Sequence, residues 1–294
     1  MFELPFALSV PYPDIDTVSS YWGSEVTATI DWCEENNVIS YYIAEFVNTI
    51  TNSFFMFLAC FAILRSVQNG FEKRFILGNC GFLLVGIGSW LFHMTLMYEF
   101  QLLDELPMLY ATCVPFWSIF SKGKSPKQTF IIGVLVTTLA GLMTAIYLII
   151  KDPTFHQACY AFLNFMIIGK SYHTITTSVD NVKYKKEIST MIMLMVKGVG
   201  SFLFGYFLWN LDIHLCSQVT QLKRFVGLPY GFLLEGHGWW HLFTGLGVYH
   251  YDIFLEYLRL FEIGKQDDYC LTTKFYILPD IETKDRQVTE KKES

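Results

Sequence analysis

Seven long apolar stretches constrain this chain more than any other feature of its sequence. About 20 apolar residues in a helix are needed to cross the core of a bilayer. Only 16% of the 294 residues are charged, which is low for a soluble domain of this length. We therefore predict an all-α integral membrane protein with a seven-transmembrane helix bundle. The candidate spans are Ser40–Leu64, Phe75–Met97, Leu106–Phe120, Phe130–Ile150, His156–Thr176, Thr190–Ile213 and Leu228–Phe261.

These spans divide the chain into three parts. Residues 1–38 form an N-terminal segment with several acidic residues and no Lys or Arg, residues 39–262 form the seven-helix domain, and residues 263–294 form a polar tail that we expect to be flexible. The first ten residues have no basic segment and contain a proline, so we predict no signal peptide. The net charge of −6 argues against nucleic acid as a partner.

Basic residues in the short loops predict the orientation in the membrane. The loops after the first, third and fifth spans carry nine Lys or Arg residues, whereas the opposite loops carry three. The positive-inside rule then places the N-terminus in the lumen and the C-terminus in the cytosol. The C-terminal Lys291-Lys292 pair resembles a coat-protein retrieval signal, which predicts the endoplasmic reticulum membrane, with the Golgi as the second location. The alternative for this pair is a solvated charged tail.

Three histidines fall at a similar depth in the predicted bundle. His93 lies near the end of the second span, and Ser89 precedes it by one turn on the same face. His237 and His241 are four residues apart in the seventh span, a spacing that suits a zinc ion. At ~1.5 Å per residue, all three lie roughly 8–15 Å below the luminal surface. Three neutral imidazoles with an open position are typical of catalytic zinc, and the alternative is a structural polar cluster.

An acidic segment precedes the first span. It contains Asp31, Glu34 and Asn36 next to Trp32, and Glu45 follows within the first turns of the span. Such carboxylates repel one another unless a cation is present, and oxygen ligands favour calcium over zinc. The alternative is a solvated acidic cap at a helix N-terminus. Because Glu45 cannot reach water easily, we favour a bound calcium ion.

Two of the seven cysteines, Cys33 and Cys216, fall in predicted luminal segments, where disulfides are permitted. A bridge between them would tie the acidic segment to the turn before the seventh span.

Several stretches of this sequence together resemble the alkaline ceramidase family, and in particular its fungal branch. The resemblance implies a seven-helix fold of the superfamily shared with adiponectin receptors. It also implies hydrolysis of ceramide, as dihydroceramide or phytoceramide, to a sphingoid base and a fatty acid. The matching stretches are Tyr21–Gly23, Asp31–Asn36, Tyr42–Phe46, Gly88–Leu96, Gln101–Tyr110, Leu211–Ser217 and Gly236–Gly245.

The resemblance also implies roles for individual residues. The resemblance implies that zinc is held by His93, His237 and His241, and that Ser89 and Asp104 lie beside a water molecule bound to the zinc. Calcium is held by Asp31, Glu34, Asn36, Glu45 and the Trp32 carbonyl, and Cys33 pairs with Cys216. Two neighbouring positions depart from the pattern: Asn37 replaces an aromatic residue, and Lys197 lies inside the sixth span where an apolar residue is expected.

These residues suggest a zinc-dependent amidase. Zinc would polarise the amide carbonyl and acidify the water, Asp104 would pass a proton to the leaving amine, and Ser89 would hydrogen-bond the developing oxyanion. Asp104 could instead orient an imidazole. Two alternatives within the fold are a lipid receptor with structural zinc and an ester-cleaving lipid-remodelling hydrolase. A channel or transporter is disfavoured, because we identify no repeating polar stripe in any span and no internal repeat.

Overall fold

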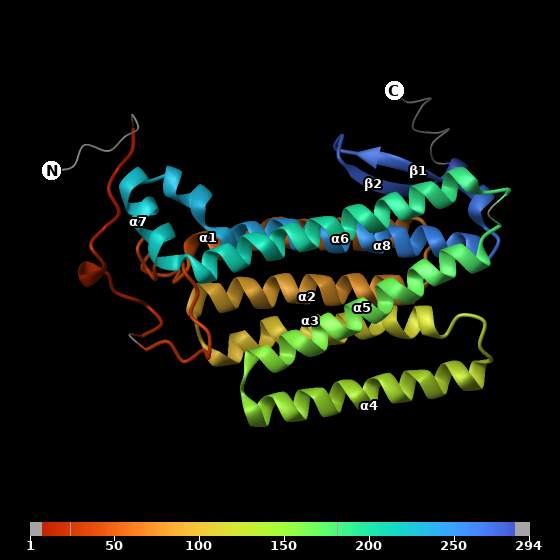
Figure 1. Ribbon diagram of the computed structural model, residues 1–294, viewed down its shortest axis with the longest axis horizontal. Coiled ribbons are helices and arrows are strands. Elements are labelled where there is room, and N and C mark those ends of the chain that lie inside the picture. The colour runs from red at the N-terminus through yellow and green to blue at the C-terminus, as the bar shows by residue number, and fades with distance from the viewer. Residues whose placement is uncertain (1–7, 24, 181, 286–294) are drawn as a thin grey trace. The chain divides into compact units, whose positions relative to one another are not determined.

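The computed structural model describes residues 8–23, 25–180 and 182–285, and most of them are helical (Figure 1). The Lys291-Lys292 pair lies outside the described residues. The predicted all-α character is confirmed for the part that corresponds to the spans. The α-helices are α1 (Phe46–Gln68), α2 (Lys73–Thr95), α3 (Tyr98–Phe120), α4 (Pro126–Ile150), α5 (Pro153–Ser178), α6 (Lys185–His214), α7 (Cys216–Val226) and α8 (Gly236–Glu262).

Four helices of the described chain are long and apolar enough to cross a membrane, namely α1, α2, α4 and α6. Helices α3, α5 and α8 are of similar length, with 23, 26 and 27 residues. Helix α3 carries Glu99, Asp104 and Glu105 in its first turns, which lowers its mean hydropathy. The helices therefore fit the class of all-α membrane proteins.

Most predicted helix boundaries differ from the structure by a few residues, and two helix starts differ by eight. The third helix begins at Tyr98 rather than Leu106, because the polar residues of its first turns are also helical. The seventh long helix begins at Gly236 rather than Leu228. It is preceded by Pro229, which is unsuited to a helix interior, and by the 3₁₀-helix η2 (Tyr230–Leu234). The short helix α7 occupies what we expected to be a simple loop.

The chain forms two compact units. Unit 1 comprises residues 1–57, 83–107 and 201–246, and unit 2 comprises residues 58–82, 108–200 and 247–294. Helices α1, α2, α3, α6 and α8 each contribute residues to both units. All the residues predicted to bind metal, and both cysteines of the predicted disulfide, belong to unit 1.

Unit 1 is held together by close backbone contacts at the beginnings and ends of its helices. The Glu45 backbone N–H donates to the carbonyl of His93 at 2.9 Å, so the start of α1 meets the end of α2. Helices α2 and α3 approach closely at Gly88, where an added Cβ would lie 2.1 Å from the Leu103 carbonyl oxygen. A side chain at position 88 would push α3 away. This approach places the first turns of α3 beside the end of α2 that carries Ser89 and His93.

The C-terminal segment of unit 2 is a folded hairpin rather than the flexible tail that we expected. Strands β1 (Tyr269–Lys274) and β2 (Leu278–Thr283) pair antiparallel. In their register, Tyr269 lies opposite Thr283 at one end and Lys274 lies opposite Leu278 at the other. Leu278 and Ile281 are buried, so the hairpin contributes apolar side chains to the interior. The sequence analysis did not predict the hairpin, because residues 266–294 are polar on average and contain few apolar side chains that could be buried.

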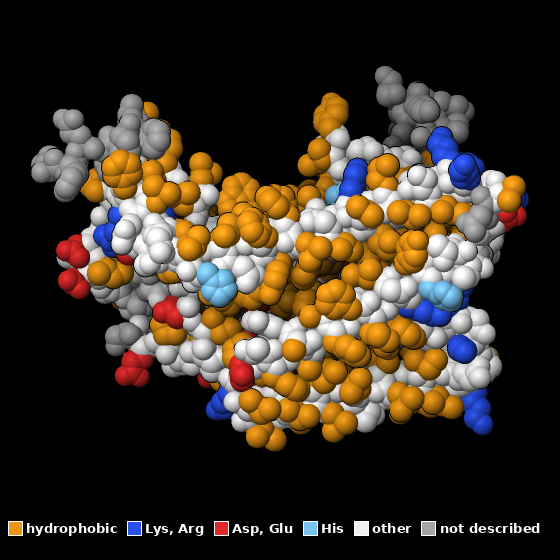
Figure 2. All heavy atoms as spheres, in the orientation of Figure 1, with side chains coloured by type: hydrophobic (Ala, Val, Ile, Leu, Met, Phe, Trp, Pro, Cys, Tyr) orange, Lys and Arg blue, Asp and Glu red, His pale blue; other side chains and the backbone are white. Residues whose placement is uncertain are grey.

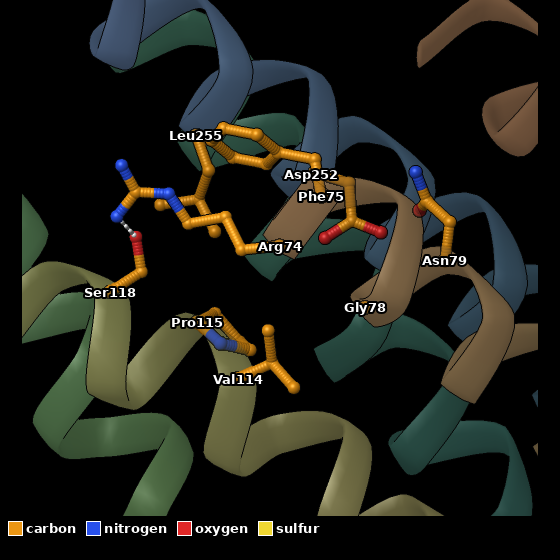
Figure 3. A pocket seen from close by; sticks show the side chains of 9 residues that line it. All are labelled: Arg74, Phe75, Gly78, Asn79, Val114, Pro115, Ser118, Asp252 and Leu255. Atoms are coloured by element: carbon orange, nitrogen blue, oxygen red, sulfur yellow. Dashed lines mark hydrogen bonds between the residues drawn. The ribbon is translucent and has the colours of Figure 1, made fainter. Parts of the chain in front are cut away.

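Helices α4 and α5 of unit 2 run antiparallel, and their visible surface is mostly hydrophobic (Figures 1 and 2). Phe130, Leu135 and Ile149 of α4 are each more than 60% exposed, as expected for helices that face lipid. Elsewhere in unit 2, a small cavity of about 30 Å³ lies among α2, α3 and α8. Arg74 donates to Ser118 Oγ at 2.8 Å and points away from the carboxylate of Asp252, which faces Asn79 (Figure 3).

Candidate metal centre

The three predicted histidines form a compact cluster in unit 1. The ring centroids of His93, His237 and His241 are 4.7–4.9 Å apart in each pair. One ligand nitrogen from each ring can be chosen so that all of them lie within 4.8 Å of one another. All three side chains are buried. Among the described residues, this is the single group of three or more His, Cys, Asp or Glu side chains whose ligand atoms come this close together, and the predicted calcium carboxylates Asp31, Glu34 and Glu45 do not form such a group.

Glu45 fixes the orientation of His93. Its Oε2 contacts His93 Nδ1, and both side chains are fully buried. A carboxylate in this position accepts the Nδ1 proton, which leaves the lone pair of Nε2 available to a metal. His93 Nε2 is buried and has no hydrogen-bond partner among the described residues. The sequence analysis predicts Glu45 only as a calcium ligand and does not identify its contact with His93.

His241 is oriented by helix α1. Its Nδ1 lies 3.0 Å from Thr51 Oγ1. The Thr51 hydroxyl donates to the carbonyl of Val47 at 2.8 Å, so its oxygen accepts from His241 Nδ1. The Nε2 atom of His241 is then the one free to bind a metal. Ser89 Oγ lies 3.5 Å from this atom, which places the serine next to the cluster.

His237 is held by aromatic packing. Its ring stacks on Trp32 with a centroid distance of 4.5 Å and an interplanar angle of 23°. Trp32 also contacts Trp209 edge to face. The Nδ1 atom of His237 is buried without a hydrogen-bond partner among the described residues. Trp32 and Glu45 therefore both link the acidic segment directly to the histidine cluster.

Asp104 lies in the first turns of α3, and the close approach of α3 to Gly88 brings its backbone near α2. A Cβ at Gly88 would lie 2.8 Å from the Asp104 backbone nitrogen, and Ser89 is the next residue along α2. Within the described part of the chain, the Asp104 carboxylate makes no hydrogen bond or ion pair. It is thus not held by another protein group.

The acidic segment is more tightly packed than a solvated helix cap would be. Glu34 is buried and accepts hydrogen bonds from the backbone N–H groups of Val47 and Asn48 at 2.7 and 2.8 Å, which caps helix α1. Burial, followed by the neighbouring carboxylates of Glu235 and Glu45, raises the pKa of Glu34 well above its ordinary value of 4.5. Glu34 therefore caps helix α1, as in the alternative to a calcium site, but its carboxyl group is buried and not exposed to solvent.

The other predicted calcium ligands lie close to this cap. Asn36 Nδ2 donates to Asp31 Oδ1 at 3.1 Å, and the Trp32 backbone N–H donates to Glu45 Oε1 at 3.2 Å. Asn36 Oδ1 is buried and has no hydrogen-bond partner in the described chain. This single oxygen lacks a donor, whereas the carboxylates of Asp31, Glu34 and Glu45 all accept hydrogen bonds. Amide and carboxylate oxygens are the ligand types that calcium prefers.

The structure contains the Cys33–Cys216 disulfide. It ties the acidic segment to the start of α7. Two further links were missed by the sequence analysis. The fully buried Lys223 donates to the Cys33 carbonyl at 3.2 Å and to Glu235 Oε2 at 3.0 Å, and Arg224 pairs with Glu35 at 2.6 Å. We had assigned both basic residues to a loop, although the amphipathic pattern of residues 216–226 could have indicated a helix.

Three polar residues at the start of α1 form a stripe that the sequence analysis does not identify: Glu45 directly precedes the helix, and Asn48 and Asn52 lie in it. Glu45, Asn48 and Asn52 recur at helical spacing and all contact the site. Asn48 Nδ2 donates to Glu45 Oε2 at 3.2 Å, and Asn52 Nδ2 lies 3.3 Å from His241 Nδ1. The spacing of three and four residues is the signal that would have identified this face of the helix.

The chain is predominantly helical, has helices that can cross a membrane, and contains a buried cluster of three histidines, and comparison with known proteins identifies the family to which it belongs. The Ceramidase family profile matches residues 24–282. The chain is 40% identical to alkaline ceramidase YPC1 of Saccharomyces cerevisiae, over 94% of this chain and 90% of that protein. It is 35% identical to mouse alkaline ceramidase 3, over 84% and 89% of the two chains. A similar protein from Arabidopsis thaliana, named alkaline ceramidase, is 29% identical.

The chain thus belongs to the alkaline ceramidase family and is a hydrolase.

Proposed function

We propose that this chain is a zinc-dependent intramembrane amidase that hydrolyses ceramide, as dihydroceramide or phytoceramide, to a sphingoid base and a free fatty acid. The observation that carries the proposal is the cluster of His93, His237 and His241, whose ligand nitrogens lie within 4.8 Å of one another. Family membership supports the substrate class, because the matched relatives are named alkaline ceramidases.

The residues present fit a zinc ion. Three imidazoles are a common ligand set for catalytic zinc. The buried nitrogens of His93 and His237 that have no protein partner are the atoms that such an ion would satisfy. When bound, zinc would supply a Lewis acid that polarises the amide carbonyl and lowers the pKa of water. Glu45 and Thr51 hold His93 and His241 in the tautomers that this role requires.

The remaining groups supply proton transfer and oxyanion stabilisation. An amide has a poor leaving group, so its nitrogen must be protonated as the bond to carbon breaks. The Asp104 carboxylate is free of protein hydrogen bonds within the described chain, so it can take a proton from the attacking water and return it to the leaving amine. Ser89, next to His241, can donate its hydroxyl proton to the developing oxyanion.

We further propose that calcium is bound by Asp31, Glu34, Asn36, Glu45 and the Trp32 carbonyl. The buried carboxylates of Glu34 and Glu45 and the unpartnered Asn36 Oδ1 support this assignment. Because Glu45 contacts His93 and Trp32 stacks on His237, the ion would brace the residues that position the histidines. Its role is structural, and a chelator that spares zinc should remove it separately.

The proposed enzyme spans the membrane seven times, with α1–α6 and α8 as the spans of a fold shared with adiponectin receptors. Its N-terminus is luminal and its C-terminus cytosolic, which the basic residues of the loops support. We place it in the membrane of the endoplasmic reticulum or Golgi, with Lys291 and Lys292 read by a coat protein. A tag at Met1 should be protected from protease in sealed vesicles, and a tag at Ser294 should be digested.

The alternatives within the same fold are a lipid receptor with structural zinc and an ester-cleaving lipid-remodelling hydrolase. The free carboxylate of Asp104 and the position of Ser89 favour an enzyme. A receptor would bind ceramide without turnover, whereas an esterase would cleave an ester analogue and leave the amide intact. Both outcomes can be read in one assay on detergent-purified protein with paired amide and ester substrates.

The metal assignment is tested by His241→Ala, with His173→Ala as the matched control because His173 is an exposed histidine of unit 2. We expect His241→Ala to insert into membranes but to lose bound zinc by elemental analysis, and with it turnover. The control should retain both. Asp104→Asn should keep zinc and lose most turnover. Normal turnover in His241→Ala would refute the zinc proposal, and joint loss of zinc and activity in Asp104→Asn would make Asp104 an orienting group.

A further inference from the structure

Lys197 is a charged residue in the middle of a helix that can cross the membrane. It lies 12 residues after Lys185, the first residue of α6, which corresponds to about 18 Å along the helix. Its side chain is exposed and forms no ion pair or hydrogen bond with the described part of the chain. An ammonium group at such a depth is costly without a partner. A lysine side chain reaches only roughly 6 Å, so it cannot return to the charged start of α6.

Beside Lys197 lies a cavity of about 230 Å³. It is open on one side and lined by residues of α6, α8 and the C-terminal hairpin, all within unit 2. One part of its lining is polar, with the Lys197 ammonium and the hydroxyl-bearing side chain of Thr273, and another part is apolar, with Met193, Leu194 and Tyr276. The cavity is smaller than the ~300–1,000 Å³ of a site that holds a whole small molecule. Its size and lining suit the head group of an amphiphile whose chains remain outside.

The hairpin wall of this cavity is fixed by buried contacts. Arg65 of α1 forms ion pairs of 2.6 Å with both Asp280 and Glu282, and all three residues are buried. The Tyr249 hydroxyl donates to the Pro279 carbonyl at 2.7 Å, and Asn69 Nδ2 donates to the Ile281 carbonyl at 2.5 Å. These contacts hold β2 against the helices. The cavity is therefore a property of the fold and not of a loose terminal segment.

The turn of the hairpin is strongly apolar and exposed. Phe275, Tyr276 and Ile277 are consecutive, and Tyr276 is fully exposed. Tyr276 and Ile277 line the cavity together with Met193, which is itself exposed on α6. Three adjacent apolar side chains are unfavourable in water, but they are well placed beside the acyl chains of a lipid. The apolar turn and the exposed face of α6 thus flank the ammonium group on the lipid side.

We propose that this cavity binds the anionic head group of a membrane phospholipid. The phosphate pairs with Lys197, the Thr273 hydroxyl donates to a phosphate oxygen, and the acyl chains lie against Phe275, Tyr276 and Met193. The partner follows from the chemistry of the site, since a phosphate supplies the missing negative charge and several acceptor oxygens. A carboxylate would satisfy Lys197 but leave much of the cavity unfilled. This site is separate from the histidine cluster, and its existence does not depend on the proposed activity.

The test uses full-length protein in nanodiscs of phosphatidylcholine, with or without phosphatidic acid. Native mass spectrometry and thermal unfolding should show retained phosphatidic acid and a higher Tm in its presence. Lys197→Met should reduce the affinity for phosphatidic acid about tenfold or more, since a charge-assisted bond is lost. Lys186→Met is the matched control, because Lys186 is an exposed lysine of the same helix outside the cavity, and it should bind as the wild type does.

Equal retention of phosphatidic acid in Lys197→Met would overturn the proposal, as would an equal loss in Lys186→Met. A parallel series with oleate distinguishes the source of the anion, because displacement of phosphatidic acid by equimolar oleate would assign the site to a fatty-acid carboxylate instead. If Lys197→Met does not insert, a photoreactive phosphatidic acid answers the question in the wild type. Crosslinks should fall in residues 190–197 and 271–277, and crosslinks confined to other segments would refute the site.

Discussion

Glu45→Gln is the substitution that most directly tests how the histidine cluster is held. The Glu45 carboxylate is fully buried and serves three donors, which are His93 Nδ1, the Trp32 backbone N–H and Asn48 Nδ2. Glutamine has nearly the same shape but offers one acceptor oxygen and an NH₂ group. Whichever way its amide is turned, at least one donor of the site faces another donor. The substitution therefore leaves a buried donor unpaired without creating a cavity.

The expected loss of zinc affinity follows from the number of buried donors left unpaired. An unpaired buried donor costs about 1–3 kcal/mol, which corresponds to a fivefold to roughly 150-fold change in an equilibrium constant. Loss of a group that orients a metal-bound histidine typically lowers metal affinity or activity about 10–100-fold. Both estimates place the loss of zinc affinity in Glu45→Gln at one to two orders of magnitude.

The measurement is zinc retention against a graded chelator, followed by turnover of the same samples. Glu35→Gln is the matched control, because Glu35 lies in the same segment but pairs with the partly exposed Arg224. It should change zinc affinity by less than about twofold, as expected for a surface ion pair. Zinc affinity within twofold of the wild type in Glu45→Gln would refute the orienting role. Recovery of zinc affinity by added calcium would show that Glu45 acts only through the calcium site.

Three further predictions concern the segments that surround the site. Glu34→Ala removes the cap of α1, and it should lower Tm and abolish any stabilisation by calcium, whereas an unchanged calcium response would leave Glu34 as a cap alone. Cys33→Ser removes a disulfide between residues 183 positions apart, and the chain entropy released in the unfolded state lowers the free energy of unfolding by at most ~5 kcal/mol. Tm should therefore fall, and a wild-type Tm that does not change on reduction would contradict a stabilising role of the disulfide. Arg65→Met leaves the buried Asp280 without a cation, while Glu282 keeps its ion pair with Lys274. Amide exchange in residues 269–283 should therefore accelerate far more in Arg65→Met than in Lys274→Met, which leaves both Arg65 pairs intact; equal exchange in the two variants would be inconsistent with the buried ion pairs.

The histidine cluster could be predicted from the sequence because its signal is local. His237 and His241 share a helical face, and the depth of His93 follows from counting residues along a span. The hairpin could not be predicted in this way, since Arg65 and Glu282 are separated by more than 200 residues and no periodicity relates them. The contact of Glu45 with His93 also depends on how two helix ends meet. Local pattern identified the three histidines of the cluster, whereas the contacts that orient them arise from tertiary packing.

The charges buried around the acidic segment suggest that the two proposed metal sites are energetically linked. Glu34, Glu45, Asp212 and Glu235 are all buried, while Lys223 is the only buried Lys or Arg in the described part of unit 1. Lys223 pairs with Glu235, so the other carboxylates need compensation from elsewhere. Glu45 lies between the two proposed ions, as it contacts His93 on one side and Trp32 on the other.

An ion on either side of Glu45 fixes the position of that carboxylate and so changes the affinity of the other site. Coupling between two binding sites is reciprocal. The factor by which calcium changes zinc affinity must therefore equal the factor by which zinc changes calcium affinity. Titrations of each metal in the presence and absence of the other measure both factors. We expect each metal to change the affinity for the other by about fivefold or more. Glu45→Gln should abolish this change. An unchanged affinity in the wild type would mean that the histidine cluster and the acidic segment bind their ions independently.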